Sequence, residues 1–281
     1  MPITAIDIEE YLQSRSDFDL ELYACRTLRE MGYEVSHGGT YIDPFKKLPR
    51  QFDVRAHRAV RHFKQFGMQL AVECKSLSEE APLLVSCVPR SREEAHFEFV
   101  HSWPRQSQRG AYARSLRYDG DGGYYRPGDL VGKRTAQVRR NANGIGFKDD
   151  DRDTYEKWSQ ALASAYDLVQ AAARAGNAAE FYTFIAPILV VSDSTLWAVD
   201  YGEDGRQSGA PRPVAGVELF VDRDYAIENP ISDQNDTYRI THLHIYTRTE
   251  FGMFLQSLDS NERNRELLFG RMLRKISETA R

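Results

Sequence analysis

The chain has 281 residues, of which 41% are hydrophobic and 28% charged, and its formal net charge is −4. These values are ordinary for a globular protein with a sizeable core. They exclude a membrane-spanning protein, since no stretch approaches the ~18 apolar residues that a spanning helix needs. The acidic start MPITAIDIEE is unlike a secretory signal. Three isolated cysteines, Cys25, Cys74 and Cys87, predict neither disulfides nor a cysteine zinc site, which favours a cytoplasmic location.

The N-terminal part predicts one helix and three strands. The helix begins at Asp17 or Asp19, carries apolar residues at helical spacing and ends at Gly32. The extended runs that follow are Tyr33–Ser36, Gln51–Val60 and Met68–Cys74. The third run, MQLAVEC, is apolar enough to predict a strand buried on both faces. Residues 76–150 are rich in Gly, Arg and Tyr and predict an irregular segment.

The C-terminal part returns to regular patterns. A helix is predicted from Asp153, with an apolar stripe that ends before Gly176. The predicted strands are Phe181–Val191, Thr195–Tyr201, Val214–Val221 and Tyr238–Thr247, with a hairpin-like turn at YGEDGR, and the predicted final helices are Arg248–Leu258 and Glu262–Thr279. No repeat or linker divides the chain, so we expect a single domain over residues 1–281, with a core at about 17–76 and 153–200, a basic insertion at about 77–150 and C-terminal strands and helices at 214–281.

Two carboxylates and one lysine fall on the predicted strands. Glu73 and Lys75 form E-C-K at the end of the apolar strand, so their side chains point to the same face. Asp53 lies in Q-F-D-V-R-A, on the strand that precedes it and can pair with it. Buried charges are costly unless something compensates them, and a divalent cation between Asp53 and Glu73 would do so. With the Lys75 ammonium nearby, such a site is equipped for phosphodiester hydrolysis.

This ordered set of residues resembles the PD-(D/E)xK, or restriction-endonuclease-like, nucleases. The resemblance implies an α/β (α+β) fold with a mixed central sheet flanked by helices, and here a long basic insertion after the E-x-K strand. Asp53 matches the D, Glu73 the (D/E) and Lys75 the K, and Glu21 in the first helix matches a glutamate found in many members. Phe52 stands where the family name has proline.

The resemblance also implies a cofactor, a substrate and a metal site. Asp53, Glu73 and the backbone carbonyl of Cys74 would bind Mg²⁺ or Mn²⁺, Lys75 would position the attacking water, and Glu21 would assist. The implied activity is DNA cleavage in bacterial restriction, defence or DNA processing, with RNA open as a substrate. A homodimer would suit cleavage of both strands, and no membrane partner is expected. The alternative is a catalytically idle module that binds nucleic acid or a protein partner.

The predicted insertion contains a segment with a local excess of positive charge. Between His101 and Lys148 lie ten basic and three acidic residues, with aromatic residues interleaved. Basic side chains can bind phosphates while rings stack on bases, but a solvated loop folded against the acidic remainder of the chain is an equally open interpretation. The candidate nucleic-acid-binding residues are Arg105, Arg109, Arg114, Arg117, Lys133, Arg134, Arg139 and Arg140.

Structural interpretations stay open for the same side chains. Glu21 lies near a helix start, where a carboxylate is favourable through the dipole alone. Asp53 could pair with a neighbouring arginine, and Glu73 could pair with Lys75 without any metal. His242 and His244 alternate on a predicted strand without a third metal ligand, which favours a structural or surface role.

Overall fold

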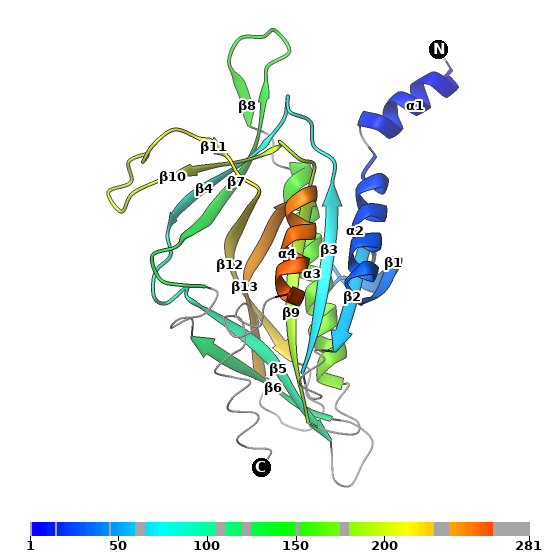
Figure 1. Cartoon of the computed structure of the whole chain (residues 1–281), viewed down its shortest axis with the longest axis vertical. Coiled ribbons are helices and arrows are strands. Elements are labelled where there is room, and N and C mark those ends of the chain that lie inside the picture. The colour runs from blue at the N-terminus through cyan, green and yellow to red at the C-terminus, as the bar shows by residue number, and fades with distance from the viewer. Residues whose placement is uncertain are drawn as a thin grey trace.

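The computed structural model describes residues 2–14, 16–44, 46–59, 66–104, 111–119, 125–149, 152–174, 180–227 and 236–260. The helices in these ranges are α1 (Ala5–Ser14), α2 (Phe18–Glu30), α3 (Arg152–Arg174) and α4 (Arg248–Ser260). The strands are β1 (Glu34–Ile42), β2 (Pro49–Ala59), β3 (Phe66–Lys75), β4 (Leu83–Pro89), β5 (His96–Pro104), β6 (Ala111–Asp119), β7 (Leu130–Arg140), β8 (Phe147–Asp149), β9 (Phe181–Val191), β10 (Leu196–Asp200), β11 (Arg212–Pro213), β12 (Gly216–Ile227) and β13 (Asp236–Thr247). They form a mixed α/β structure around one large sheet (Figure 1).

The middle of the sheet combines antiparallel and parallel pairs. Strands β1, β2 and β3 form an antiparallel meander, and β3 then pairs in parallel with β9, which pairs in parallel with β13. The long connection from β3 to β9 contains α3, as a crossover between parallel strands requires. The order continues as β12, β7, β4, β10 and β11.

The elements nearest the predicted site follow the sequence signals. The helix α2 buries Leu20, Ala24 and Leu28 on one side and ends before Gly32, whose φ of +77° lies in the left-handed region. Almost every residue of β3 is buried, which confirms the prediction of a strand covered on both faces. The predicted strand Phe181–Val191 coincides with β9.

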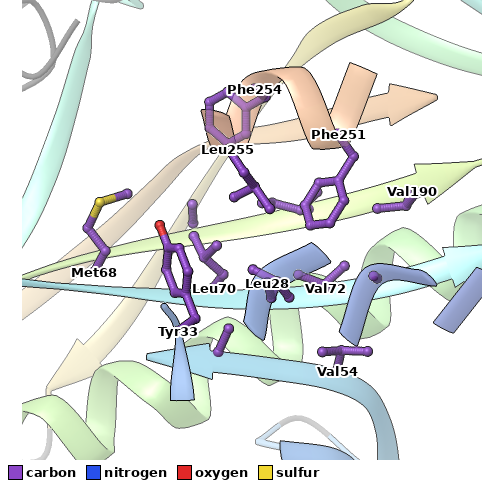
Figure 2. Packing of buried hydrophobic residues seen from close by; sticks show 14 of the residues in the cluster. Leu28, Tyr33, Val54, Met68, Leu70, Val72, Val190, Phe251, Phe254 and Leu255 are labelled. Atoms are coloured by element: carbon purple, nitrogen blue, oxygen red, sulfur yellow. The ribbon is translucent and has the colours of Figure 1, made fainter. Parts of the chain in front are cut away.

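Helices cover both faces of the central strands. The face of β3 that carries Leu70, Val72 and Cys74 packs against α2 and α4, whose Leu28 and Phe251 belong to the same buried cluster (Figure 2). The other face carries Ala71, which belongs to a second cluster with residues of α3. Glu73 therefore points toward α3, because side chains alternate along a strand.

The prediction of an irregular segment over residues 76–150 is wrong. Strands β4 to β8 lie within it, and β4 and β7 extend the large sheet between β12 and β10. In β4 only alternate residues, among them Leu83, Val85 and Cys87, are fully buried. Sparse alternation among Ser, Arg and Gly is a weak signal, and pairing with distant strands provides the missing stabilisation.

Three smaller predictions have different outcomes. The YGEDGR turn is confirmed, because Gly202 N–H donates to the Arg206 carbonyl and β10 pairs with the short β11. The helix α1 was not predicted, although Thr4 and Asp7 form a reciprocal cap at its start. The predicted helix Glu262–Thr279 lies outside the described residues. No helix in the described part of the chain is long and apolar enough to cross a membrane.

Candidate functional site

The pairing of β2 with β3 brings Asp53 and Glu73 together. The register pairs Val54 with Val72, so the two carboxylates occupy the next positions on the same face. The Asp53 N–H lies 3.4 Å from Glu73 Oε1, and Cys74 N–H donates to Asp53 Oδ2 at 2.8 Å. Asp53 is 8% exposed and Glu73 is fully buried. The predicted convergence of these two residues is therefore present in the structure.

A lysine from α3 lies against both carboxylates. Lys157 Nζ is 2.8 Å from Asp53 Oδ2 and 3.8 Å from Glu73 Oε2, and it is also 3.8 Å from Asp17 Oδ2. Burial disfavours its charge, but these carboxylates outweigh that effect and raise the pKa of Lys157. Asp17, Asp53, Glu73 and Lys157 are called the carboxylate cluster below.

Glu73 is the member of this cluster whose ionised form is disfavoured by its surroundings. Burial and the neighbouring charge of Asp53 raise the pKa of Glu73 well above its usual value, although Lys157 partly opposes them. Glu73 Oε2 is buried and accepts no hydrogen bond from the described residues, and the Lys157 ammonium lies 3.8 Å from it. A buried carboxylate oxygen without a donor is a suitable ligand for a cation.

The oxygen donors fit a magnesium-type ion better than other metals. Within the described ranges no group of three or more His, Cys, Asp and Glu side chains is arranged to hold a metal. Mg²⁺ usually keeps several waters and takes only one or two protein carboxylates, which Asp53 and Glu73 can supply. The position of the Cys74 carbonyl as a further ligand stays a prediction.

Lys75 is held at the edge of the carboxylate cluster. Its Nζ lies 3.7 Å from Asp17 Oδ2, while Asp17 Oδ1 accepts a hydrogen bond from Ser76 N–H at 2.6 Å. Asp17 lies at the predicted start of α2, but its side chain makes no capping hydrogen bond there. It ties the start of α2 to the end of β3.

Glu21 is placed apart from the carboxylate cluster. Its Oε2 lies 2.8 Å from His37 Nε2 of β1, and both side chains are partly buried. His37 pairs with Val54 in the sheet, so it shares the face that packs against α2, opposite to Glu73. The structure therefore does not bring Glu21 to Asp53 and Glu73.

The alternative ion pairs considered for the site residues are not formed. Arg50 pairs with Asp43 at 3.4 Å, and Arg55 donates to Asp167 at 2.7 Å. Neither arginine forms an ion pair with Asp53, which pairs with Lys157 instead.

An open cleft of about 910 Å³ begins at Lys75. One wall is formed by residues 75–82, which follow β3, and the other by the end of β7 and by β8. Glu10 of α1 and Asp153 of α3 also line it. The carboxylate cluster is thus next to a space large enough for part of a polymeric substrate.

The candidate nucleic-acid-binding residues divide between this cleft and other places. Arg139 and Arg140 line the cleft. Arg114 lies over Trp103 on the β5–β6 pair, and Arg117 pairs with Asp119 there. Lys133 pairs with Glu94, and Arg134 lies beside it on β7. Arg105 and Arg109 lie outside the described residues.

A second buried polar group lies on β13. His242 stacks on the Tyr125 ring with centroids 3.9 Å apart, and His244 Nε2 lies 2.9 Å from the Tyr125 hydroxyl. Burial lowers the pKa of His242 well below its usual value and that of His244 to about 3, so both rings are neutral at pH 7. Tyr125, His242 and His244, called the histidine cluster below, agree with the predicted structural role.

Sequence analysis did not assign Asp17 or Lys157 to the site. A lysine in the second turn of a helix is ordinary on a protein surface, so only tertiary packing reveals Lys157 as buried against carboxylates. The sequence predicts Asp17 as a helix cap and gives no sign of its contact with Ser76. Comparisons of the chain with protein-family models, with curated proteins and with solved structures find no match.

Proposed function

We propose that the protein is a Mg²⁺- or Mn²⁺-dependent endonuclease of the restriction-endonuclease-like type, acting on DNA. The observation that carries the proposal is the pair of buried carboxylates on adjacent strands, in which Glu73 Oε2 accepts no hydrogen bond from any described residue. The cleft that begins at Lys75 adds room for a polyanion beside the cation site. A site that needs a cation and borders a cleft suits phosphodiester hydrolysis.

The order of elements around the carboxylates supports the same proposal. With strands β4 to β8 set aside as the insertion, the succession α2, β1, β2, β3, α3 and β9 follows the helix, strand and motif order on which the resemblance rests. Asp53 and Glu73 lie on an antiparallel strand pair in the interior of the sheet, where the family carries its motif.

In the proposed mechanism each side chain has a separate task. A divalent ion at this site lowers the pKa of water and neutralises charge that develops on the phosphate. Asp53 and Glu73 hold the ion, and Lys75 orients the water or the phosphate from the mouth of the cleft. Lys157 compensates the two carboxylates before the ion arrives.

One observation favours a second candidate function. Lys157 already lies between Asp53 and Glu73, so its ammonium compensates part of the charge that a metal would neutralise. A protein that no longer binds metal would be expected to fill the site in this way. The second candidate is therefore an idle nuclease-fold module that binds nucleic acid or a protein partner.

Cleavage assays with Mg²⁺ or Mn²⁺ test the proposal. Supercoiled plasmid, linear duplex and single-stranded DNA are incubated with the parent protein and with Glu73→Ala, and we expect the variant to lose about 100-fold or more of the activity. Glu34→Ala, at an exposed position of β1, is the matched control and should cleave as the parent does. Activity that persists in Glu73→Ala indicates a contaminant and contradicts the assignment.

A second variant separates metal binding from chemistry. Lys75→Met is expected to abolish cleavage while calorimetry still detects Mn²⁺ binding, because Lys75 is not a ligand in the proposed site. Lys46→Met changes an exposed lysine and serves as the control. Equal cleavage by Lys75→Met and the parent removes Lys75 from the mechanism, and absence of Mn²⁺ binding in the parent favours the idle module.

A further inference from the structure

The β7–β8 hairpin combines exposed apolar residues with basic ones at the far wall of the cleft. Ile145 is 76% exposed and Phe147 is 66% exposed, so two large apolar side chains are open to solvent on this one hairpin. Arg139 and Arg140 lie in the strand that pairs with β8, at the positions opposite Lys148 and Phe147.

The hairpin has a defined shape. Asn141 N–H donates to the Gly146 carbonyl, and the Asn141 side chain donates to the Ile145 carbonyl at 2.8 Å. Gly144 and Gly146 have φ values of +73° and +76°, which side chains rarely adopt. The tip is thus a built turn that holds Ile145 outward, and the Arg140 guanidinium lies 5.2 Å from the centroid of the Phe147 ring.

The hairpin stands at the end of the molecule where the proposed catalytic residues lie. Figure 1 shows it extending beyond the sheet at the end where β3 finishes. Arg139, Arg140 and Phe147 line the same cleft as Lys75. Arg140 is exposed, so its guanidinium is open to an anionic ligand. Arg139 is half-buried, and its Nε is enclosed without a hydrogen-bond partner among the described residues.

Charge is distributed unequally over the walls of the cleft. The hairpin carries Arg139 and Arg140, whereas Glu79 and Glu80 line the cleft from the segment that follows β3 and Glu10 lines it from α1. A polyanion is repelled from these glutamates and attracted to the hairpin, so it is directed along the hairpin toward Lys75. Arginine with aliphatic and aromatic side chains is the equipment of proteins that wedge into duplex DNA at base steps.

We propose that the β7–β8 hairpin binds duplex DNA, with Arg139 and Arg140 on phosphates and with Ile145 and Phe147 inserted against a base step. The proposal rests on the proposed nuclease function for its choice of polymer. A duplex is favoured over a single strand because Ile145 at the tip is aliphatic and has no ring to stack on a free base, which leaves that contact to Phe147. The hairpin would bend the duplex and present its backbone to the carboxylate cluster.

Binding is measured separately from cleavage. Fluorescence anisotropy with a labelled duplex, without divalent metal, compares the full-length parent with Ile145→Ala/Phe147→Ala and with Arg139→Ala/Arg140→Ala. We expect each double variant to bind at least tenfold more weakly. The arginine variant should also lower the slope of log affinity against log salt by about 2, one for each lost phosphate contact. Leu22→Ala/Met253→Ala, which removes two large apolar side chains that are about half exposed and lie outside the cleft, should bind as the parent does.

A base-stacking probe distinguishes insertion from simple adhesion. A duplex with 2-aminopurine at successive positions should brighten at one step on binding the parent and stay dark with Ile145→Ala/Phe147→Ala. Unchanged affinity in both double variants, failure of the parent to bind duplex, or equal sensitivity with single-stranded DNA overturns the proposal. Failure of the nuclease function is visible separately, as hairpin-dependent binding by a parent protein that cleaves nothing.

Discussion

Asp53 and Glu73 of the carboxylate cluster lie on the same sheet as His242 and His244 and are likewise buried, but the two clusters differ in charge and in access. The histidine cluster is neutral, and its rings line a cavity of only about 10 Å³, the size of one water. The carboxylate cluster carries three acids and one ammonium beside a cleft of about 910 Å³. Both clusters hold a buried atom without a hydrogen-bond partner among the described residues, His242 Nε2 and Glu73 Oε2. A neutral ring nitrogen is tolerated at lower cost than a partly compensated charge, so the carboxylate cluster next to the open cleft is the better candidate for a ligand.

A metal ion should stabilise the protein through the carboxylate cluster alone. At a thousandfold excess over its dissociation constant, Mn²⁺ is expected to raise the free energy of unfolding by about 4 kcal/mol. Glu73→Gln and Asp53→Asn should abolish this gain, because they remove the proposed ligands. His242→Phe, in the histidine cluster, should keep it. Urea unfolding with and without MnCl₂ measures the effect, and an equal gain in Glu73→Gln would show that the metal binds elsewhere.

The ammonium of Lys157 should matter most when no metal is present. Lys157→Met leaves two buried carboxylates unpaired and should lower the free energy of unfolding by about 3 kcal/mol at pH 7. The pKa of Lys157 is raised in the folded protein, so its stabilisation is fully present at this pH and is lost only in strong alkali. Saturating Mn²⁺ should reduce the difference in free energy of unfolding between Lys157→Met and the parent, since the ion replaces the ammonium.

The control for Lys157 is Lys46→Met, which alters an exposed lysine and should change stability by no more than about 0.5 kcal/mol. A Lys157→Met protein as stable as the parent without metal would mean that the two carboxylates are protonated or hydrated. A deficit that Mn²⁺ leaves unchanged would argue that metal and ammonium do not share a site.

The histidine cluster should govern the response to acid. Burial lowers the pKa values of His242 and His244 in the folded protein. Below pH 6.5 the two imidazoles therefore bind protons in the unfolded chain but not in the folded one. Stability therefore falls as the pH falls, by about 2 kcal/mol between pH 7 and 5.5 for the two rings together. Urea unfolding at both pH values should show this loss in the parent and a smaller one in His242→Phe. An identical loss in the variant would assign the acid sensitivity to other groups.

The sequence predicts the parts of the fold that local patterns determine. The helix α2 with its Gly32 end, the buried strand β3 and the strand β9 could all be predicted from periodicity. Strands β4 to β8 could not, because their alternation is sparse and their pairing partners lie far away along the chain. The same division holds for the site: Asp53 and Glu73 follow from strand positions, whereas Lys157 enters through the packing of α3.

Substitutions of Glu21 test whether this residue acts together with the carboxylate cluster, and their expected effects are the smallest. Its contact with His37 is a partly exposed pair, so Glu21→Gln and His37→Gln should each lower stability by about 1 kcal/mol, and the double variant by little more. The cleavage rate should fall no more than about threefold in each variant, because Glu21 lies on α2, against the sheet face opposite to the one that carries Glu73. Stability from urea unfolding and rates from plasmid cleavage are measured on the same preparations. A loss of about 100-fold in Glu21→Gln with normal rates in His37→Gln would place Glu21 in the chemistry, and would require its side chain to turn from His37 toward the cleft when DNA and metal bind.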